Sequence, residues 1–402
     1  MQLMNFEVLN ETLEASPAVS VVVVGAGGGG SNAVNRMIDC GIKGVKFIAI
    51  NTDAQALKKN KAGIKLQIGS QVTGGMGAGG DPKVGEKAAL EDKEQIAKVL
   101  EGADMVFITA GMGGGTGTGS APVIAGIAKS QGALTVAVVT KPFDFEKSYR
   151  MELAEDGIKE LRKAVDSLII IPNQRILSNV DRKTSIPEAF RKVDDILRQG
   201  VQGISDCILE TGDINIDFAD VKTVMKDQGD ALMSIGYGAG ENRVDEAVSG
   251  ALDNPLLEDT SIRGATRALV YVAGSEELPV IEYQEVVQRI TTDMDPDANT
   301  IIGTYLDPSL GDKIRVTVIA SGFETGNKGD KQEAAKPNKS DVITGNELAD
   351  IAGLGFGSEF LPRRNIPDEY RYASEDLEIP TVIRDRRFNS FSADTLVSAQ
   401  AN

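Results

Sequence analysis

A glycine-rich stretch at residues 111–120 contains the residue types that point most directly to chemistry. It reads Gly-Met-Gly-Gly-Gly-Thr-Gly-Thr-Gly-Ser. Residues without a Cβ let several backbone N–H groups turn toward one point, so that a bulky anion can approach closely. The apolar run Met105–Ala110 before it predicts a buried strand, and Ser120–Pro122 after it predicts the start of a helix. A strand, a glycine loop and the positive end of a helix together predict a phosphate site.

A second glycine run, Gly25–Asn32, follows the strand-like segment Val19–Val24 and precedes a helical pattern. Gly25, Gly27 and Gly30 alone fit the dinucleotide pattern G-x-G-x-x-G, with Asp53 near the position of a ribose-binding acid. A dinucleotide-dependent oxidoreductase therefore stays a possible alternative. Two glycine loops favour a nucleoside triphosphate instead, because its longer phosphate tail can be held from two sides.

A third glycine-rich segment, Gly74–Pro82, is either a loop that closes over the terminal phosphate or a surface loop, and both interpretations stay open. The sequence contains no G-x-x-x-x-G-K-[ST] motif, so there is no P-loop lysine to neutralise the phosphates. Backbone N–H groups and a metal must meet that charge, which implies Mg²⁺. The sequence identifies no ligands for this metal.

Composition narrows the function classes. The chain has 402 residues, and 59 acidic residues against 42 basic ones give a net charge of −17, so we expect no nucleic-acid partner. Histidine is absent, which excludes serine-histidine hydrolysis and histidine-ligated zinc. Cys40 and Cys207 fall in apolar helical patterns and are expected to be reduced core thiols. With no apolar run near the ~20 residues of a membrane span, we expect a cytoplasmic protein without direct membrane insertion.

Other polar residues occupy positions where a nucleotide-binding sheet collects ligand groups. Glu146 and Arg150 are four residues apart, so they form either a surface ion pair or a pair of contacts to ribose and phosphate. Asn173 follows the strand Ser167–Ile171 at its carboxyl end. Asp194 and Asp195 lie on a long helical stripe from Ile186, where one carboxylate could accept N1–H and N2–H of guanine. Solvated acids are the simpler alternative there.

An acidic segment follows the long helix. Between Gly212 and Val221, three carboxylates and an amide alternate with apolar residues: Asp213, Asn215, Asp217 and Asp220. Such a loop could polarise water or bind a metal. Helix N-capping is expected to account for only one of these acids, Asp220.

In this order, the motifs resemble the FtsZ family of bacterial tubulin homologues. Gly113–Gly119 is similar to the tubulin signature, and Gly28–Asn32, Asn51–Asp53 and Asn215–Asp220 match further family motifs. The resemblance runs from about Val19 to Phe323. It implies a protein that binds GTP or GDP and polymerises head to tail into filaments of the cell-division ring at mid-cell. It also implies that GTP is hydrolysed only when the acidic loop of one subunit meets the nucleotide of the next.

The resemblance also implies roles for individual residues. The phosphate-binding residues would be Gly28, Gly29, Gly30, Ser31, Asn32, Gly115, Thr116, Gly117 and Thr118. Glu146 and Arg150 would serve ribose and phosphate, while Asn173, Phe190 and Asp194 would hold guanine. The residues offered to the neighbouring subunit would be Asp217, Asp220 and Asn215. Two positions depart from the family pattern, because Ser31 stands where glycine or asparagine is frequent and Asp81 adds a charge near the expected γ-phosphate.

The expected fold class is α/β: a tubulin-like, Rossmann-type parallel-sheet GTPase domain joined by a long central helix to a smaller mixed-sheet domain, then a disordered tail. The expected parts are an N-terminal arm (1–18), a GTP-binding domain (19–184), the central helix (185–211), the acidic loop with the C-terminal domain (212–323), a disordered linker (324–375), a docking peptide (376–387) and an unassigned tail (388–402). By resemblance, the peptide Asp376–Arg387 would bind membrane tethers and division regulators.

Overall fold

The computed structural model describes residues 19–323, except 178–180, 182, 210–213, 215, 253–261, 276, 293 and 296. Asn215 and the expected segments 1–18, 324–375, 376–387 and 388–402 therefore lie outside the described residues. None of the helices in the described part combines the length and the apolar character needed to cross a membrane.

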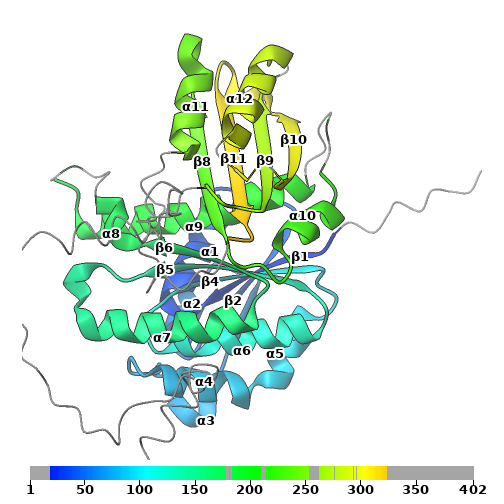
Figure 1. Cartoon of the computed structure of the whole chain (residues 1–402). Helices are drawn as coiled ribbons and strands as arrows, with labels where there is room; N and C mark the ends of the chain where they lie inside the picture. Colours follow the sequence, from blue (N-terminus) through cyan, green and yellow to red (C-terminus); the bar gives the residue numbers. More distant parts are fainter. Residues whose placement is uncertain are drawn as a thin grey trace, which may run out of the picture. The chain divides into compact units, whose positions relative to one another are not determined.

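The first part of the chain is built on a parallel sheet (Figure 1). Its strand order is β3-β2-β1-β4-β5-β6-β7, and every described pairing within it is parallel. The strands are β1 Val21–Ala26, β2 Val45–Asn51, β3 Ile64–Gln67, β4 Met105–Gly111, β5 Leu134–Lys141, β6 Ser167–Pro172 and β7 Gly229–Asp230. The central strands are buried along nearly their whole length, as their apolar sequences predict.

Helices cover both faces of this sheet, because successive side chains of a strand point to opposite sides. Val22 and Val24 of β1 pack in one core with α4 (Pro82–Glu91), α5 (Lys93–Leu100), α6 (Thr116–Ser130) and α7 (Ser148–Ala164). Val21 and Val23 pack in a second core with α1 (Gly27–Asp39), α2 (Ala54–Lys59), α9 (Ile186–Leu209) and α10 (Phe218–Met225). Two short helices, α3 (Ser70–Thr73) and α8 (Asn173–Ile176), follow β3 and β6.

The expected central helix is α9, a 24-residue helix that runs along the second face. At 1.5 Å per residue it is about 36 Å long. Near its start, Phe190 contacts Phe143, which follows the carboxyl end of β5. At its end, Leu209 lies against Gly44, just before the amino end of β2. The helix therefore connects the two ends of the parallel strands.

The second sheet has the order β10-β9-β11-β8 and is mixed, as the sequence predicts. Its strands are β8 Leu232–Gly238, β9 Arg267–Gly274, β10 Asn299–Leu306 and β11 Ile314–Ser321. One face, with Leu269, Tyr271 and Ile319, shares the core of α9 and α10. The other face packs against α11 (Arg243–Leu252) and α12 (Val280–Thr292).

Strand β8 was not expected, because the sequence analysis assigned no strand to 232–238. Gly236 and Gly238 look like turn residues in the sequence, and the structure shows why a strand carries glycine at these positions. A Cβ at Gly236 or at Gly238 would lie 1.8 Å from a backbone oxygen of α11, Ala247 O or Arg243 O. Glycine is needed here because the helix backbone packs directly on the strand.

The expected burial of both cysteines was wrong for one of them. Cys207 is buried, but Cys40 is exposed at the C-cap of α1, and both thiols are free. The chain turns away at Gly41, whose φ of +74° ends the helix.

Candidate nucleotide site

Both predicted phosphate loops lie at the point where the order of the parallel sheet reverses. The chain passes from β1 outward to β2 and β3, then returns to pair β4 on the other side of β1. Ligands of open α/β sheets bind at the carboxyl ends of the strands at such a point. The glycine runs follow β1 and β4, so the topology brings them side by side.

The contact between these loops is made by backbone. A Cβ at Gly27 would lie only 2.6 Å from the backbone nitrogen of Gly117, and Gly27 has a φ of +68°. A Cβ at Gly29 would lie 3.1 Å from Gly111 N, whereas Gly28 faces open space. Glycine is required at Gly27 for both its conformation and the close approach.

The two helices begin earlier than expected. The glycines of 27–30 are the first turn of α1, and Thr116, rather than Ser120, is the first residue of α6. Neither N-cap residue, Ala26 or Gly115, gives a side-chain hydrogen bond to its helix. The first backbone N–H groups of both helices are thus left uncapped by side chains at the reversal point, which suits an anion.

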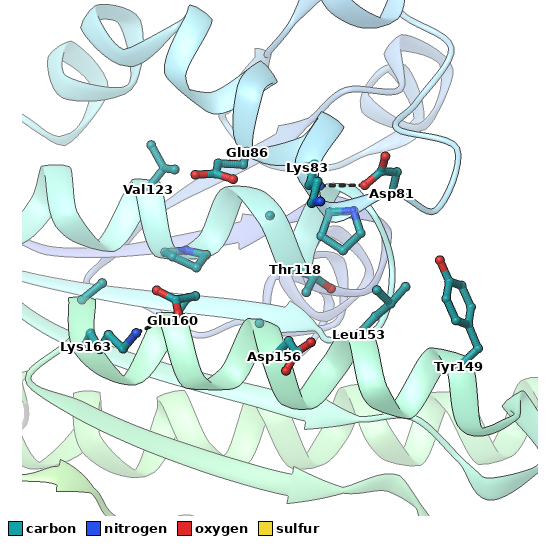
Figure 2. Close-up of a pocket in the computed structure, with 15 residues that line it drawn as sticks. Asp81, Lys83, Glu86, Thr118, Val123, Tyr149, Leu153, Asp156, Glu160 and Lys163 are labelled. Carbon is teal, nitrogen blue, oxygen red and sulfur yellow. Dashed lines mark hydrogen bonds and ion pairs between the residues drawn. The ribbon is translucent and has the colours of Figure 1, made fainter. Parts of the chain in front are cut away.

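The third glycine segment, Gly74–Pro82, lies against the glycine loop at residues 111–120. A Cβ at Gly115 would lie 2.8 Å from Ala78 Cβ and 2.9 Å from Asp81 N. The Asp81 carboxylate accepts a hydrogen bond from Lys83 N at 2.9 Å and so caps α4 (Figure 2). This capping gives the Asp81 charge a structural role that the sequence analysis did not assign to it.

Figure 2 also shows a pocket between α4, α6 and α7, next to the cradle that the two phosphate loops, Gly25–Asn32 and residues 111–120, form together. Its volume is about 790 Å³, and Asp81, Thr118 and Gly119 line it together with Tyr149 and Leu153. The Thr118 hydroxyl accepts a hydrogen bond from Gly113 N at 2.8 Å. The pocket and the phosphate loops therefore share the first turn of α6.

The residues expected to hold guanine come from elements that a small apolar cluster brings together. Phe143, Ile176, Ala189 and Val193 form its buried part. Phe190 stands edge-on to Phe143 at 5.3 Å between ring centroids and is 38% exposed. Asn173 is 4% exposed, and its Oδ1 has no hydrogen-bond partner among the described residues. A buried acceptor without a partner suits a ligand that donates to it.

The structure distinguishes the two neighbouring acids of α9. Asp195 accepts hydrogen bonds from Arg198 and Gln199 and pairs with Arg36 at 3.4 Å. Burial raises the pKa of Asp195, but these partners outweigh it and hold the pKa below its ordinary value. Burial raises the pKa of Asp194 from 3.8 to about 7, with only the charge of Arg36 opposing the shift. Asp194, unlike its neighbour, has its carboxylate available for a ligand.

Glu146 and Arg150 form the expected ion pair, at 3.1 Å. Glu146 also accepts a hydrogen bond from Phe143 N at 2.9 Å, and its side chain is only 12% exposed. Arg150 packs on the glycine loop at residues 111–120, because a Cβ at Gly113 would lie 2.9 Å from Arg150 Cγ. The pair therefore connects the guanine side of the site with the phosphate loop.

The acids of the loop before α10 lie at the other end of the sheet. Both helices that flank these acids end there. Leu209, at the end of α9, lies against Gly44 before the amino end of β2, and Met225, the last residue of α10, accepts a hydrogen bond from Ser167, the first residue of β6. Asp217 rather than Asp220 is the N-cap of α10, which corrects the expectation. Asp220 N donates to Asp217 Oδ1 at 2.8 Å, and Asp217 N donates back to Asp220 Oδ2 at 3.3 Å. Capping thus involves both acids.

Comparison with known proteins agrees with this geometry. Residues 20–181 match the GTPase domain of the Tubulin/FtsZ family, and residues 229–324 match the C-terminal domain of the FtsZ family. An empty FtsZ dimer from M. jannaschii is 46% identical, with a TM-score of 0.73 over 77% of this chain and 90% of that one. The chain belongs to the FtsZ family. It is a tubulin-like GTPase of the cytoskeleton and binds guanine nucleotide.

Further solved structures extend the likeness. A mutant form of M. jannaschii FtsZ is also 46% identical, with a TM-score of 0.72 over 76% of this chain and 92% of that one. CetZ2 from Haloferax volcanii, solved as a GTPγS-bound protofilament, is 19% identical with a TM-score of 0.64 over 77% of this chain and 95% of that one. At that identity it shows the shared fold alone.

FtsZ-family membership removes the dinucleotide alternative. The acid that the dinucleotide pattern expects at the ribose starts a helix in this structure. Asp53 is the N-cap of α2, and its Oδ1 accepts from Gln55 N at 2.8 Å and Ala56 N at 3.1 Å.

The structure adds information on two hydroxyl groups of the site, those of Ser31 and Thr52. Ser31 Oγ is buried just after the first turn of α1, without a partner among the described residues, which fits the expectation that Ser31 binds phosphate. Thr52 was named only as part of a motif, yet its hydroxyl contacts that of Thr116. Only the parallel pairing of β2 with β1 could have indicated this contact.

Proposed function

We propose that this GTPase polymerises head to tail, that the acidic loop of the next subunit completes each hydrolytic site, and that the filaments form the division ring in the cytoplasm at mid-cell. One observation carries the proposal: the phosphate loops and the acids occupy opposite ends of the same parallel sheet. The loops follow the carboxyl ends of β1 and β4, whereas the two helices that flank the acids, α9 and α10, both end at the amino ends of the strands, beside Gly44 and Ser167.

The distance between the phosphate loops and the acids indicates whether a chain can use its own acids for hydrolysis or needs those of a neighbouring chain. Strand β4 has seven residues, so at about 3.3 Å per residue the two ends of the sheet are roughly 20 Å apart. A proton-transfer group must come within hydrogen-bond reach of the attacking water. Asp217 and Asp220 of one chain are therefore too far from the phosphates held by that chain, but a second chain stacked end to end presents its own acids there.

Within the proposed site, each part has a separate task. The first turns of α1 and α6, with Gly28, Gly29, Gly30, Ser31, Asn32, Gly115, Thr116, Gly117 and Thr118, donate to phosphate oxygens. Arg150 adds positive charge beside the loop, and Glu146 holds Arg150 in place while facing ribose. Asn173, Phe190 and Asp194 hold guanine. From the neighbour, Asp217 and Asp220 orient and deprotonate water, assisted by Asn215.

In the proposed site, Mg²⁺ would be held mainly by the nucleotide and not by protein side chains. Among the described residues, no three Asp, Glu or Cys side chains group into a metal site. Mg²⁺ commonly keeps several waters and binds through substrate phosphates with few protein ligands, so the donor set here fits a metal that arrives with GTP. Bound in that way, Mg²⁺ would offset phosphate charge that no P-loop lysine neutralises.

The remaining partners are part of the same proposal. Self-association is supported by the similar M. jannaschii FtsZ, which was solved as a dimer. The peptide 376–387 would bind membrane tethers and division regulators, and we expect neither nucleic-acid binding nor direct membrane insertion.

GTP turnover measured against protein concentration, with light scattering in the same sample, tests this function. Turnover per subunit should rise steeply at the concentration where scattering appears. A rate per subunit that is independent of concentration would contradict the shared site.

A further inference from the structure

The hydroxyl groups of Thr52 and Thr116 are 2.6 Å apart. Thr52 is fully buried, with 0% exposure, in the turn between β2 and α2. Thr116 is the first residue of α6, in the glycine loop at residues 111–120. Thr52 itself is on neither phosphate loop, but β2 pairs with β1, so the turn after β2 reaches the edge of the cradle.

We propose that Thr52 is a positioning residue for nucleotide binding, which fixes the Thr116 hydroxyl so that its proton points at a phosphate oxygen. This inference rests on the phosphate placement in the function proposed above. It assigns a task to a residue outside the glycine loops.

Two hydroxyl groups in contact can share a hydrogen bond in either of two directions. Each has one proton to donate and two lone pairs that accept. If Thr52 donates to Thr116, the Thr116 proton is free to point into the cradle, where it can donate to an anion. If Thr116 donated to Thr52 instead, it would present only lone pairs to the phosphate, which repel it. Bound phosphate therefore selects the first arrangement, and the buried position of Thr52 keeps water from replacing it.

The turn that carries Thr52 also holds the third glycine segment. Ala54 N donates to Gly75 O at 3.1 Å, and Asp53 forms an isolated antiparallel bridge with Met76. The same turn thus contacts the helix that receives the phosphates and the segment that lies against Gly115. A displacement of Thr116 would therefore disturb both the start of α6 and the third glycine segment.

Nucleotide affinity, measured by calorimetry on the full chain below the assembly concentration, tests the inference. Thr52→Val keeps the shape but removes the hydroxyl, and it should weaken GDP binding about tenfold, because the hydrogen bond from Thr116 to the charged phosphate is then no longer held in place. Binding of guanosine, which has no phosphate, should change little. Thr52→Ser should restore most of the GDP affinity, because it keeps the donor.

A double-mutant cycle supplies the decisive comparison. Added to Thr116→Val, Thr52→Val should cause no further loss of GDP affinity, since the hydroxyl that it positions is already absent. Equal GDP affinity of Thr52→Val and wild type, or equal losses for GDP and guanosine, would overturn the inference and indicate a structural role. Equal affinities of the wild-type protein for GDP and guanosine would instead contradict the phosphate placement in the proposed function.

Discussion

Asp217 and Asp220 bond to each other's backbone, Asp220 N to Asp217 Oδ1 at 2.8 Å and Asp217 N to Asp220 Oδ2 at 3.3 Å. Each carboxylate thereby uses one oxygen to start α10 and keeps the other for a different partner. Asp217 is exposed, and Asp220 is partly exposed. The geometry that caps α10 also fixes the acids that we propose for the neighbour's water.

Structural and catalytic roles of Asp217 can be separated by substitution. Asn caps helices about as well as Asp, so Asp217→Asn should leave the free energy of unfolding within a few tenths of a kcal/mol, whereas Asp217→Ala should lower it by about 1 kcal/mol. Both should lose turnover by about 100-fold or more while keeping GTP affinity. Denaturant unfolding and GTPase assays check this. An Asn variant with normal turnover would exclude Asp217 as the base.

GTP affinity should depend on pH through Asp194, whose pKa burial raises to about 7 in the free protein. Only the ionised carboxylate can accept both N–H groups of guanine. Below pH 7 the group must lose its proton on binding, so the dissociation constant should rise toward tenfold per pH unit as the pH falls. Titration with a fluorescent GTP analogue from pH 5.5 to 8 measures this. Asp194→Ala should bind more weakly with a flat profile over that range; an unchanged slope would assign the proton elsewhere.

The same shift predicts a change in stability. Because the folded pKa of Asp194 is raised above its unfolded value, the folded state holds more protons between about pH 4 and 7. The contribution of Asp194 to stability should therefore decline as the pH rises through that window. The free energies of unfolding of the wild type and Asp194→Asn, compared at pH 5 and pH 8, measure this contribution. Relative to the wild type, the Asn variant should be more stable at pH 8 than at pH 5. A constant difference would show that the carboxyl titrates normally.

Two glycines of α6 offer a matched pair. A Cβ at Gly119 would lie 1.9 Å from Pro82 O, whereas one at Gly126 would meet nothing within 4 Å. Gly119→Ala should destabilise the protein by about 1–3 kcal/mol and weaken nucleotide binding, because α4 and the third glycine segment must shift. Gly126→Ala should stabilise it by about 0.5–1 kcal/mol. Thermal unfolding checks both, and similar effects of the two substitutions would mean that α4 does not pack this closely.

Metal binding should require the nucleotide. Since the described residues offer no cluster of ligands, calorimetric titration of the nucleotide-free protein with Mg²⁺ should show little heat, and titration with GTP present should show clear binding. Chelation should stop turnover while reducing GTP affinity less. Tight Mg²⁺ binding to the nucleotide-free protein would reveal a protein-built metal site.

Much of the fold follows from sequence pattern. The buried strands β1, β4, β5 and β6 and helix α9 are recognisable because long apolar runs and a sustained helical stripe depend on local periodicity. Strand β8 was missed because its glycines, which look like a turn, are dictated by a helix that packs on it. Such a contact is tertiary and leaves no periodic signal.

The site shows the same division. The glycine loops can be recognised from composition alone, and their proximity in space follows from the strand order of the parallel sheet. The choice between Asp194 and Asp195 follows only in part, because Arg198 lies three residues after Asp195 on α9 whereas Arg36 comes from α1. The pairing of Thr52 with Thr116 spans 64 residues and likewise needs the assembled sheet.

The central claim is that one chain's acids act on GTP held by another, and mixing two inactive variants tests it most directly. Asp217→Asn keeps an intact nucleotide cradle, and Asp194→Ala keeps intact acids. Each alone should turn over little GTP. Mixed in equal amounts under conditions where sedimentation shows that they assemble together, they should hydrolyse GTP well above the sum of their separate rates, because some contacts join an intact cradle to intact acids. A co-assembled mixture no more active than that sum would contradict hydrolysis between subunits.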